Sequence, residues 1–243
     1  MSLPRIPAAV IANVARQVDI VNHETGARTP WIPNAEQELS WAAAFEGDAM
    51  ILKPRAVGIS TCFDLDDVLW TMTCDAIKQR VRCGVCLDTD DKAKERAKQM
   101  RDFLWQLDLK NDGNEHVIRF PFGSEIVCFS AGGERPAAST QFQRIRFSEY
   151  AYYGADALSA IGPSIGLGAR TVIETTCGAV GRNFNATKLL WRKQDPKMRK
   201  LFFALELHHE YKAPPQAITD EEWARLRDEG FTDRSAAAWF LTV

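Results

Sequence analysis

The sequence predicts an α/β fold in which a mostly parallel central sheet lies between layers of helices. From residue 49 onward, short β-rich apolar runs alternate with longer helical patterns, which is typical of such a sheet. The chain has 243 residues, enough for one large α/β domain with a small appendage. Hydrophobic residues make up 46% of it, so a sizeable core is available.

The first half of the chain contains two expected strands and three expected helices. We interpret the N-terminal segment 1–21 as an amphipathic helix. The run AMIL at 49–52 predicts a buried strand, and 60–80 predicts a helix. VRCGVCL at 81–87 predicts the next strand. Two aspartates then open a strong helical pattern over 90–107.

The second half begins with a predicted β-hairpin. Two short strands, 116–120 and 125–129, flank the turn signal PFG at 121–123. We expect this hairpin to extend the sheet. The elements expected after it are a strand over 142–147, a helix over 151–160 and a strand over 171–174.

The C-terminal segment predicts a small helical appendage. After Pro214 and Pro215, the run TDEE at 219–222 is a capping box that opens a helix reaching about Asp228. We therefore divide the chain into a main domain over 1–205, which includes the N-terminal helical segment, and a small helical linker subdomain over 206–243.

Charge does not identify a partner. The chain has 30 basic and 32 acidic side chains, a net charge of -2, so a broad basic surface is excluded but a local patch is not. No segment approaches the roughly 18 apolar residues of a membrane span, so we expect no membrane partner. A basic cluster at 192–200 is interpreted as a solvated helix face, with DNA contact as the alternative.

The cysteines predict reduced thiols in the core. All six lie scattered in apolar segments, and CGVC at 83–86 has no second pair for a zinc ribbon. We expect buried strand thiols rather than a metal or redox site.

The segment KPRAVGIST at 53–61 is the strongest candidate for chemistry. It follows a buried strand and opens a helix, the setting of a phosphate-binding loop. Amides at the helix start would surround a phosphate, and Ser60 falls where such loops bind Mg²⁺. The strict pattern GxxxxGK[ST] would need glycine at 53 and lysine at 59, where the chain has Lys53 and Ile59. The generic motif therefore leaves a plain helix start open.

Two later strand ends supply further candidates. Hydrolysis of a nucleotide needs a carboxylate to polarise the attacking water, and QRIRFSEYA at 143–151 places Glu149 at the end of a strand. VIETTCG at 172–178 ends another strand in Thr175 and Thr176. Taken alone, these segments favour a solvated glutamate and a chance pair of threonines.

These segments resemble, in order, the motifs of the large subunit of tailed-bacteriophage terminases. ILKPRAVGIST at 51–61 is similar to the deviant Walker A motif of that family, in which the phosphate-binding cation stands at the start of the loop. The resemblance implies that Lys53 or Arg55 supplies this charge. It also implies that the rest of the loop holds the nucleotide, namely Ala56, Val57, Gly58, Ile59, Ser60 and Thr61.

The other motifs extend the resemblance over about residues 30–240. The segment 143–151 resembles the family's Walker B motif, with Glu149 as the catalytic glutamate and Ser148 in place of the Asp that many P-loop proteins use to orient Mg²⁺. Thr175 and Thr176 match the coupling motif that senses the γ-phosphate. WIPNAEQ at 31–37 resembles the adenine-recognition segment, in which Gln37 contacts the base. Trp31 is interpreted as a core residue, with stacking on the base as the alternative.

The loop at 130–140 and the tail complete the comparison. Arg135 matches an arginine finger that reaches the ATP of a neighbouring subunit, although a solvated loop arginine is an equal alternative. The tail at 207–240 resembles the stretch that closes the ATPase domain. In longer relatives a nuclease domain follows it, so we expect no nuclease activity in this chain.

The resemblance implies a three-layer P-loop NTPase of the ASCE/RecA-like type. Its cofactors would be ATP and Mg²⁺, the metal being held by Ser60 and, through water, by Glu149. ATP hydrolysis would drive double-stranded DNA, regardless of sequence, into a procapsid in the host bacterial cytoplasm. The implied partners are the portal protein, the small terminase subunit and other copies in a ring, with a monomer expected in isolation. The alternatives are a weak or inactive P-loop scaffold and another P-loop DNA motor such as a helicase.

Overall fold

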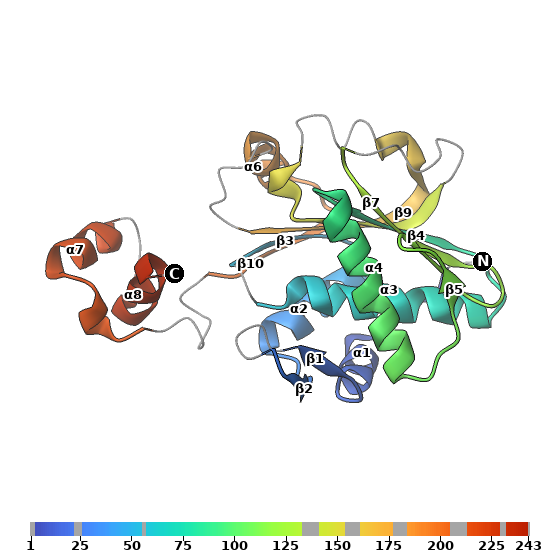
Figure 1. Ribbon diagram of the computed structural model, residues 1–243. Coiled ribbons are helices and arrows are strands. Elements are labelled where there is room, and N and C mark those ends of the chain that lie inside the picture. Colours follow the sequence, from blue (N-terminus) through green and yellow to red (C-terminus); the bar gives the residue numbers. More distant parts are fainter. Residues whose placement is uncertain are drawn as a thin grey trace.

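A computed structural model describes residues 3–21, 26–54, 57–132, 141–153, 161–176, 184–204, 213–228 and 232–242. Its main feature is an eight-stranded sheet in the order β10-β3-β9-β8-β4-β7-β6-β5 (Figure 1). The six strands from β10 to β7 are parallel, and β6 and β5 are antiparallel additions. This confirms the predicted mostly parallel α/β sheet. Among the described residues, no helix combines the length and apolar character that a bilayer span requires.

The strands and their bounds follow the sequence predictions with some differences. A separate two-stranded sheet pairs β1 (Asp19–Val21) with β2 (Arg28–Pro30). The main-sheet strands are β3 (Asp48–Lys53), β4 (Arg82–Leu87), β5 (Asp112–Gly113), β6 (Val117–Arg119), β7 (Glu125–Ser130), β8 (Phe142–Ser148), β9 (Ile165–Thr176) and β10 (Met198–Phe202).

The helices lie on both faces of the sheet (Figure 1). The helices α1 to α4 cover one face, and α6 covers the other together with the turn η1 (Tyr150–Tyr152). The expected three layers are therefore confirmed. The α-helices are α1 (Ala8–Ala15), α2 (Ala35–Glu46), α3 (Ile59–Ala76), α4 (Asp90–Gln106), α6 (Phe184–Arg192), α7 (Asp220–Asp228) and α8 (Arg234–Thr242).

Alternation along the strands divides the core between the two faces. In β3, Ala49 and Ile51 pack with α1, α2 and α3, whereas Met50 joins the cluster on the opposite face. Cys83 and Cys86 show the same alternation in β4, and both are buried free thiols. The prediction of buried strand thiols at this pair is confirmed.

The predicted hairpin is confirmed, and helix α3 anchors its turn. Strands β6 and β7 pair antiparallel, with Val117 opposite Val127. The Asp75 carboxylate, near the end of α3, accepts hydrogen bonds from the amides of Phe122 at 2.9 Å and Ser124 at 2.8 Å. A buried carboxylate thus satisfies two turn amides that lack a strand partner.

Three predicted segments differ in the structure. The predicted helix over 1–21 is wrong at its end, because α1 covers only Ala8–Ala15 and Asp19–Val21 is strand β1. The predicted strand at 171–174 is the end of the much longer β9. The basic cluster at 192–200 is not one helix face, because α6 ends at Arg192 and the chain then forms β10 at the sheet edge. Tertiary pairing with β3 overrides the polar character of MRKLF at 198–202.

The remaining segments are described in part. The predicted helix at 151–160 begins as the 3₁₀ turn η1, and its residues 154–160 lie outside the described residues. The capping box is confirmed, since Glu222 accepts the Thr219 amide at 2.8 Å and the Glu222 amide donates to Thr219 Oγ1 at 3.2 Å. The α7 and α8 helices share a small cluster of Ile218, Leu226, Ala237 and Ala238. The proposed boundary at 205/206 falls outside the described part of the chain.

Candidate functional site

The predicted phosphate-binding loop lies at the carboxyl end of β3. That strand ends at Lys53 and α3 begins at Ile59, so the loop connects a buried strand to a helix start as expected. Gly58, which precedes the helix, has a φ of 72°, in the left-handed region. Ile59, at the position where the strict motif has lysine, is completely buried in the core between α1, α2 and the sheet. Its side chain therefore packs in the core and does not supply the charge of the usual lysine.

Gln37 holds this loop in place. Its Nε2 donates to the Val57 carbonyl at 3.1 Å, and its Oε1 accepts from Trp31 Nε1 at 3.0 Å and from the Asn34 amide at 3.2 Å. Asn34 completes a capping box at the start of α2. Contact with adenine remains a prediction for Gln37, which is buried against the loop here. Trp31 stacks on Phe103 at 5.9 Å between ring centroids, which confirms its interpretation as a core residue.

Gly58 cannot carry a side chain without moving Gln37. A Cβ built on Gly58 would lie 2.5 Å from Gln37 Nε2. We expect Gly58→Ala to lower the free energy of unfolding by about 1–2 kcal/mol, because alanine is strained in the left-handed conformation. Loss of the Gln37–Val57 hydrogen bond should lower it by about 1 kcal/mol more. Gly168→Ala is the control, because its φ is 77° with open space around the added Cβ. Urea denaturation measures both, and equal losses would contradict the proposed contact.

Three charged side chains converge beside the loop. The Lys53 ammonium lies 2.8 Å from Glu149 Oε1 and 3.3 Å from Glu174 Oε2. These residues come from the carboxyl ends of β3, β8 and β9, which are neighbours in the sheet. Ligands in parallel sheets bind at this end of the strands. The structure thus brings the predicted cation and the predicted catalytic carboxylate together.

Glu174 links the loop helix to the end of β8. Its Oε2 accepts a hydrogen bond from Ser60 Oγ at 3.0 Å, and its Oε1 accepts one from Ser148 Oγ. Ser148 is directly opposite Glu174 in the parallel register of β8 and β9. The hydroxyl predicted to bind Mg²⁺ therefore shares a carboxylate with the residue that replaces the usual Walker B Asp.

The two threonines of the predicted coupling motif contact the segment that carries Glu149. Thr176 donates through Oγ1 at 2.8 Å and through its amide at 3.2 Å to Glu149 Oε2. Thr175 Oγ1 accepts the Ala151 amide at 3.0 Å. Glu149 itself has a φ of 57°, a left-handed conformation that is rare for glutamate and common among strained functional residues.

Lys53 and Glu174 stabilise each other's charged forms. Burial alone lowers the pKa of Lys53, but Glu174 and Glu149 outweigh it and raise that pKa. Burial alone would raise the pKa of Glu174, but Lys53 and Arg146 outweigh it and lower that pKa. Both groups therefore carry their charges at neutral pH, ready to interact with a charged ligand.

Beneath the cluster, two arginines of β8 meet three aspartates of α3. Arg146 pairs with Asp64, with Asp67 at 2.8 Å and with Glu174 at 3.4 Å. Arg144 pairs with Asp66, and its Nε lies 2.8 Å from Asp67 Oδ1. All of these side chains are buried. Helix α3 and strand β8 are therefore joined by charges as well as by apolar packing.

Several predicted site residues fall outside this cluster or outside the described residues. Thr61 Oγ1 accepts a hydrogen bond from Gln99 Nε2 of α4 at 3.3 Å. Arg55, Ala56 and Arg135 lie outside the described part of the chain, so their proposed roles remain predictions.

Glu174 and Arg146 were not predicted from the sequence as functional residues. Each is a charged residue inside an otherwise strand-like segment, and both side chains are completely buried. A charged side chain that faces the core needs a buried partner of opposite charge. A charged residue within an apolar strand segment was therefore a signal in the sequence for a buried ion pair. It could not have named the partner, because Ser60 and Glu174 are 114 residues apart.

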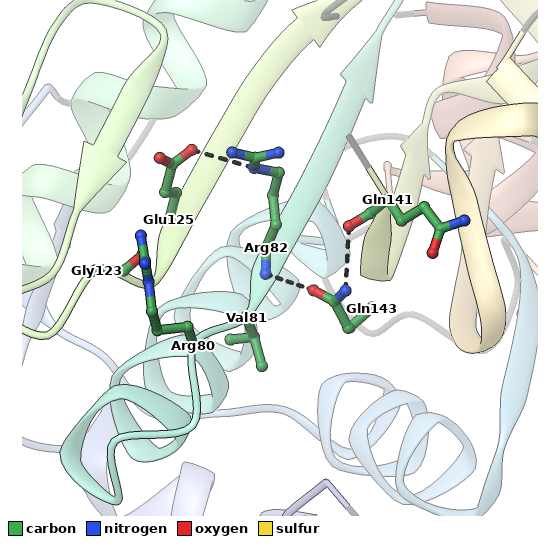
Figure 2. Close-up of a pocket in the computed structure, with 7 residues that line it drawn as sticks. All are labelled: Arg80, Val81, Arg82, Gly123, Glu125, Gln141 and Gln143. Carbon is green, nitrogen blue, oxygen red and sulfur yellow. Dashed lines mark hydrogen bonds and ion pairs between the residues drawn. The ribbon is translucent and has the colours of Figure 1, made fainter. Parts of the chain in front are cut away.

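A separate hollow opens at the opposite end of the sheet (Figure 2). Its polar groups pair with one another, since Arg82 Nε lies 3.2 Å from Glu125 Oε2 and the Arg82 amide donates to Gln143 Oε1 at 2.7 Å (Figure 2). The hollow lies at the amino ends of β4 and β7. We therefore assign no nucleotide to it.

The residues at the loop fit a magnesium nucleotide. Hydroxyl and carboxylate oxygens are the ligands and water acceptors that Mg²⁺ prefers, and Ser60, Ser148 and Glu174 present them together. The first amides of α3 precede its first intrahelical hydrogen bond, so they would stabilise phosphate oxygens at the loop. Lys53 adds a buried positive charge.

No protein-family model matches the sequence, and no curated protein matches it. Solved structures do resemble the fold. The large terminase of bacteriophage HK97 has a TM-score of 0.66 at 12% identity, covering 96% of this chain and 53% of that one. The large terminase ATPase domain of Thermus phage P74-26 has a TM-score of 0.57 at 13% identity, covering 85% and 92%.

A third similar structure contains a nucleotide. The large terminase of a thermophilic bacteriophage, in complex with ATP-γ-S, has a TM-score of 0.53 at 11% identity, covering 79% of this chain and 48% of that one. The chain therefore spans about half the length of the HK97 protein and of this thermophilic-phage protein. This chain has the fold of the ATPase domain of bacteriophage large terminases.

Proposed function

We propose that this chain is the ATP-hydrolysing motor domain of a phage terminase large subunit, which drives double-stranded DNA into a procapsid. The observation that carries the proposal is the meeting of Glu149 with Lys53 and Thr176 beside Ser60 at the start of α3. A carboxylate, a cation and a phosphate-binding helix start at one sheet edge are the parts that phosphoryl transfer needs. The terminase fold supports the same activity.

Each residue at the site has a role in this proposal. The amides from Gly58 to Thr61 bind phosphate oxygens, Lys53 or Arg55 balances their charge, and Gln37 recognises adenine. Ser60 and, through water, Glu149 hold Mg²⁺, which neutralises charge on the phosphates when it is bound. Glu149 accepts the proton of the attacking water.

The contacts of Glu149 suggest how phosphate binding activates it. Oε1 lies against Lys53 and Oε2 accepts two hydrogen bonds from Thr176. A bound γ-phosphate competes for the Lys53 ammonium, which frees Oε1 to accept a proton from water. Loss of the phosphate restores the ion pair, and Thr176 carries the change into β9. Thr175 carries it into η1 through the Ala151 amide.

The wider assembly follows from the same proposal. Copies of the chain form a ring on the portal protein, receive DNA from the small terminase subunit and grip the phosphate backbone regardless of sequence. The work takes place in the host bacterial cytoplasm. Arg135 of one subunit reaches the nucleotide of the next and stabilises charge in the transition state.

The test is Mg²⁺-dependent ATP hydrolysis by the purified chain over a range of protein concentrations. We expect the rate per subunit to rise with concentration, because Arg135 from a neighbour completes each site. An arginine finger contributes about 10³–10⁵-fold to kcat. A rate per subunit that is constant over the whole range would contradict completion of the site by a neighbour.

Mixing two inactive variants separates this contribution from other effects of assembly. Arg135→Ala subunits keep Glu149, and Glu149→Gln subunits keep Arg135. We expect the mixture to regain hydrolysis that neither variant shows alone. Tight ATP binding without hydrolysis at any concentration would favour the inactive scaffold instead.

A further inference from the structure

The end of β8 lacks the acidic residue that usually orients the magnesium ion. Ser148 stands immediately before Glu149, where many P-loop proteins have Asp. A hydroxyl is neutral and does not replace the charge of a carboxylate near a divalent cation. If the site uses Mg²⁺, another residue must supply that charge.

Glu174 is the buried carboxylate in contact with this position. It lies on β9, directly opposite Ser148 in the register, and Ser148 Oγ donates to its Oε1. An acidic residue at position 174 instead of 148 therefore lies on the neighbouring strand β9, at the position paired with the end of β8. The paired residues of parallel strands lie about 4.8 Å apart, a distance that a glutamate side chain spans.

The second carboxylate oxygen points to the loop. Glu174 Oε2 accepts the hydrogen bond of Ser60 Oγ at 3.0 Å and lies 3.3 Å from Lys53 Nζ. Ser60 is the hydroxyl at the predicted magnesium position, and Lys53 is a candidate phosphate cation. Glu174 thus contacts both groups on which a bound Mg²⁺–phosphate unit would rest.

The surroundings hold this carboxylate in one position. Glu174 is fully buried, and Arg146 Nη1 lies 3.4 Å from Oε1. Arg146 Nη1 also donates to the Ser60 carbonyl at 3.4 Å, so the same arginine contacts both the helix start and the carboxylate. Groups that orient metal-bound water need this kind of support.

We propose that Glu174 takes the role of the missing Walker B Asp and orients the water molecules around the Mg²⁺ that accompanies ATP. This inference rests on the proposed ATPase function. The acidic function has moved from β8 to β9, and Ser148 has become its hydrogen-bond donor. Glu149 keeps the separate task of accepting a proton from water.

The test compares ATP-γ-S binding with Mg²⁺ and with EDTA by calorimetry, so that no turnover is needed. Groups that support metal ligands typically contribute about 10–100-fold to metal affinity. We expect Glu174→Gln to reduce the Mg²⁺-dependent gain in affinity by about that factor. Binding in EDTA should stay equal or become tighter, because a negative charge near the phosphates is lost.

A charge-swapped variant guards against misfolding. Ser148→Asp combined with Glu174→Ser returns the acid to β8 and keeps one buried negative charge near Lys53 and Arg146. We expect this variant to fold and to retain the Mg²⁺-dependent gain within about threefold, a difference of under 1 kcal/mol. A folded double variant that lacks the gain would overturn the inference.

Asp66→Asn is the matched control, because it removes a similarly buried carboxylate that pairs with Arg144. It should alter stability and leave the Mg²⁺-dependent gain unchanged. If Glu174→Gln leaves the gain unchanged, or weakens binding equally with Mg²⁺ and with EDTA, Glu174 is only a structural counter-ion. If the wild-type chain binds no ATP-γ-S, the proposed function fails and the role of Glu174 fails with it.

Discussion

Glu149→Gln is expected to reduce kcat for ATP hydrolysis by about 10²–10⁴-fold, the usual contribution of a general base. The amide keeps the size of the side chain and an oxygen that accepts from Thr176, but it cannot take a proton from water. ATP binding should persist, because the loop amides and Ser60 are unchanged. The expected pattern is therefore a loss in kcat with little change in the affinity for nucleotide, measured by steady-state kinetics and calorimetry.

The control for this variant is Glu125→Gln at the other end of the sheet. Glu125 and Glu149 have similar side-chain exposure, 21% and 24%, and each pairs with a basic residue. Glu125→Gln should leave kcat within about twofold, because a difference of about 0.4 kcal/mol is a factor of two. Hydrolysis by Glu149→Gln at a rate close to wild type would remove Glu149 from the chemical step.

Arg146→Met is expected to lower the free energy of unfolding by about 3–5 kcal/mol, the usual cost of breaking a buried ion pair. The substitution preserves apolar length but leaves Asp64, Asp67 and Glu174 without the guanidinium that contacts all three. Uncompensated charges in the interior are costly because they have lost their hydration. Urea denaturation followed by circular dichroism measures the loss.

Arg82→Met is the matched control for this effect. Arg82 is 28% exposed and pairs with Glu125, so water already screens much of that interaction. We expect it to change stability by at most about 1 kcal/mol. Equal, small losses in both variants would show that the buried network contributes no more than a surface ion pair.

Local patterns in the sequence were sufficient for most of the fold. The periodicity of 90–107 and its acidic start predicted α4, which begins at Asp90 after the Thr89 cap. The turn at 121–123 predicted the β6–β7 hairpin. β10 was missed because Met198–Phe202 is polar and half exposed, so its strand character comes from pairing with β3 and not from its own composition.

The residues of the candidate site also divide into those that were predicted from the sequence and those that were missed. Ser60 and Glu149 were predicted because each lies next to a strand end or a helix start, and those positions can be recognised locally. Lys53 and Thr176 were predicted from the resemblance to the terminase motifs. The contact of Glu174 with Ser60 could not be predicted from the sequence, because the strand order β3-β9-β8 sets which strand ends are adjacent. The order of strands in a sheet depends on packing over the whole chain.

The sequence by itself therefore determined most of the strands and helices, and which strand ends carry hydroxyl, acidic and basic groups, because these depend on neighbours in the chain. The strand Met198–Phe202 is an exception, since its strand character comes from pairing with β3. Only the tertiary structure decided that Glu174 occupies the position next to Ser148 and that Arg146 joins it to α3. The physical reason is that a buried charge is stable only beside its partner, and folding alone brings partners from distant segments together.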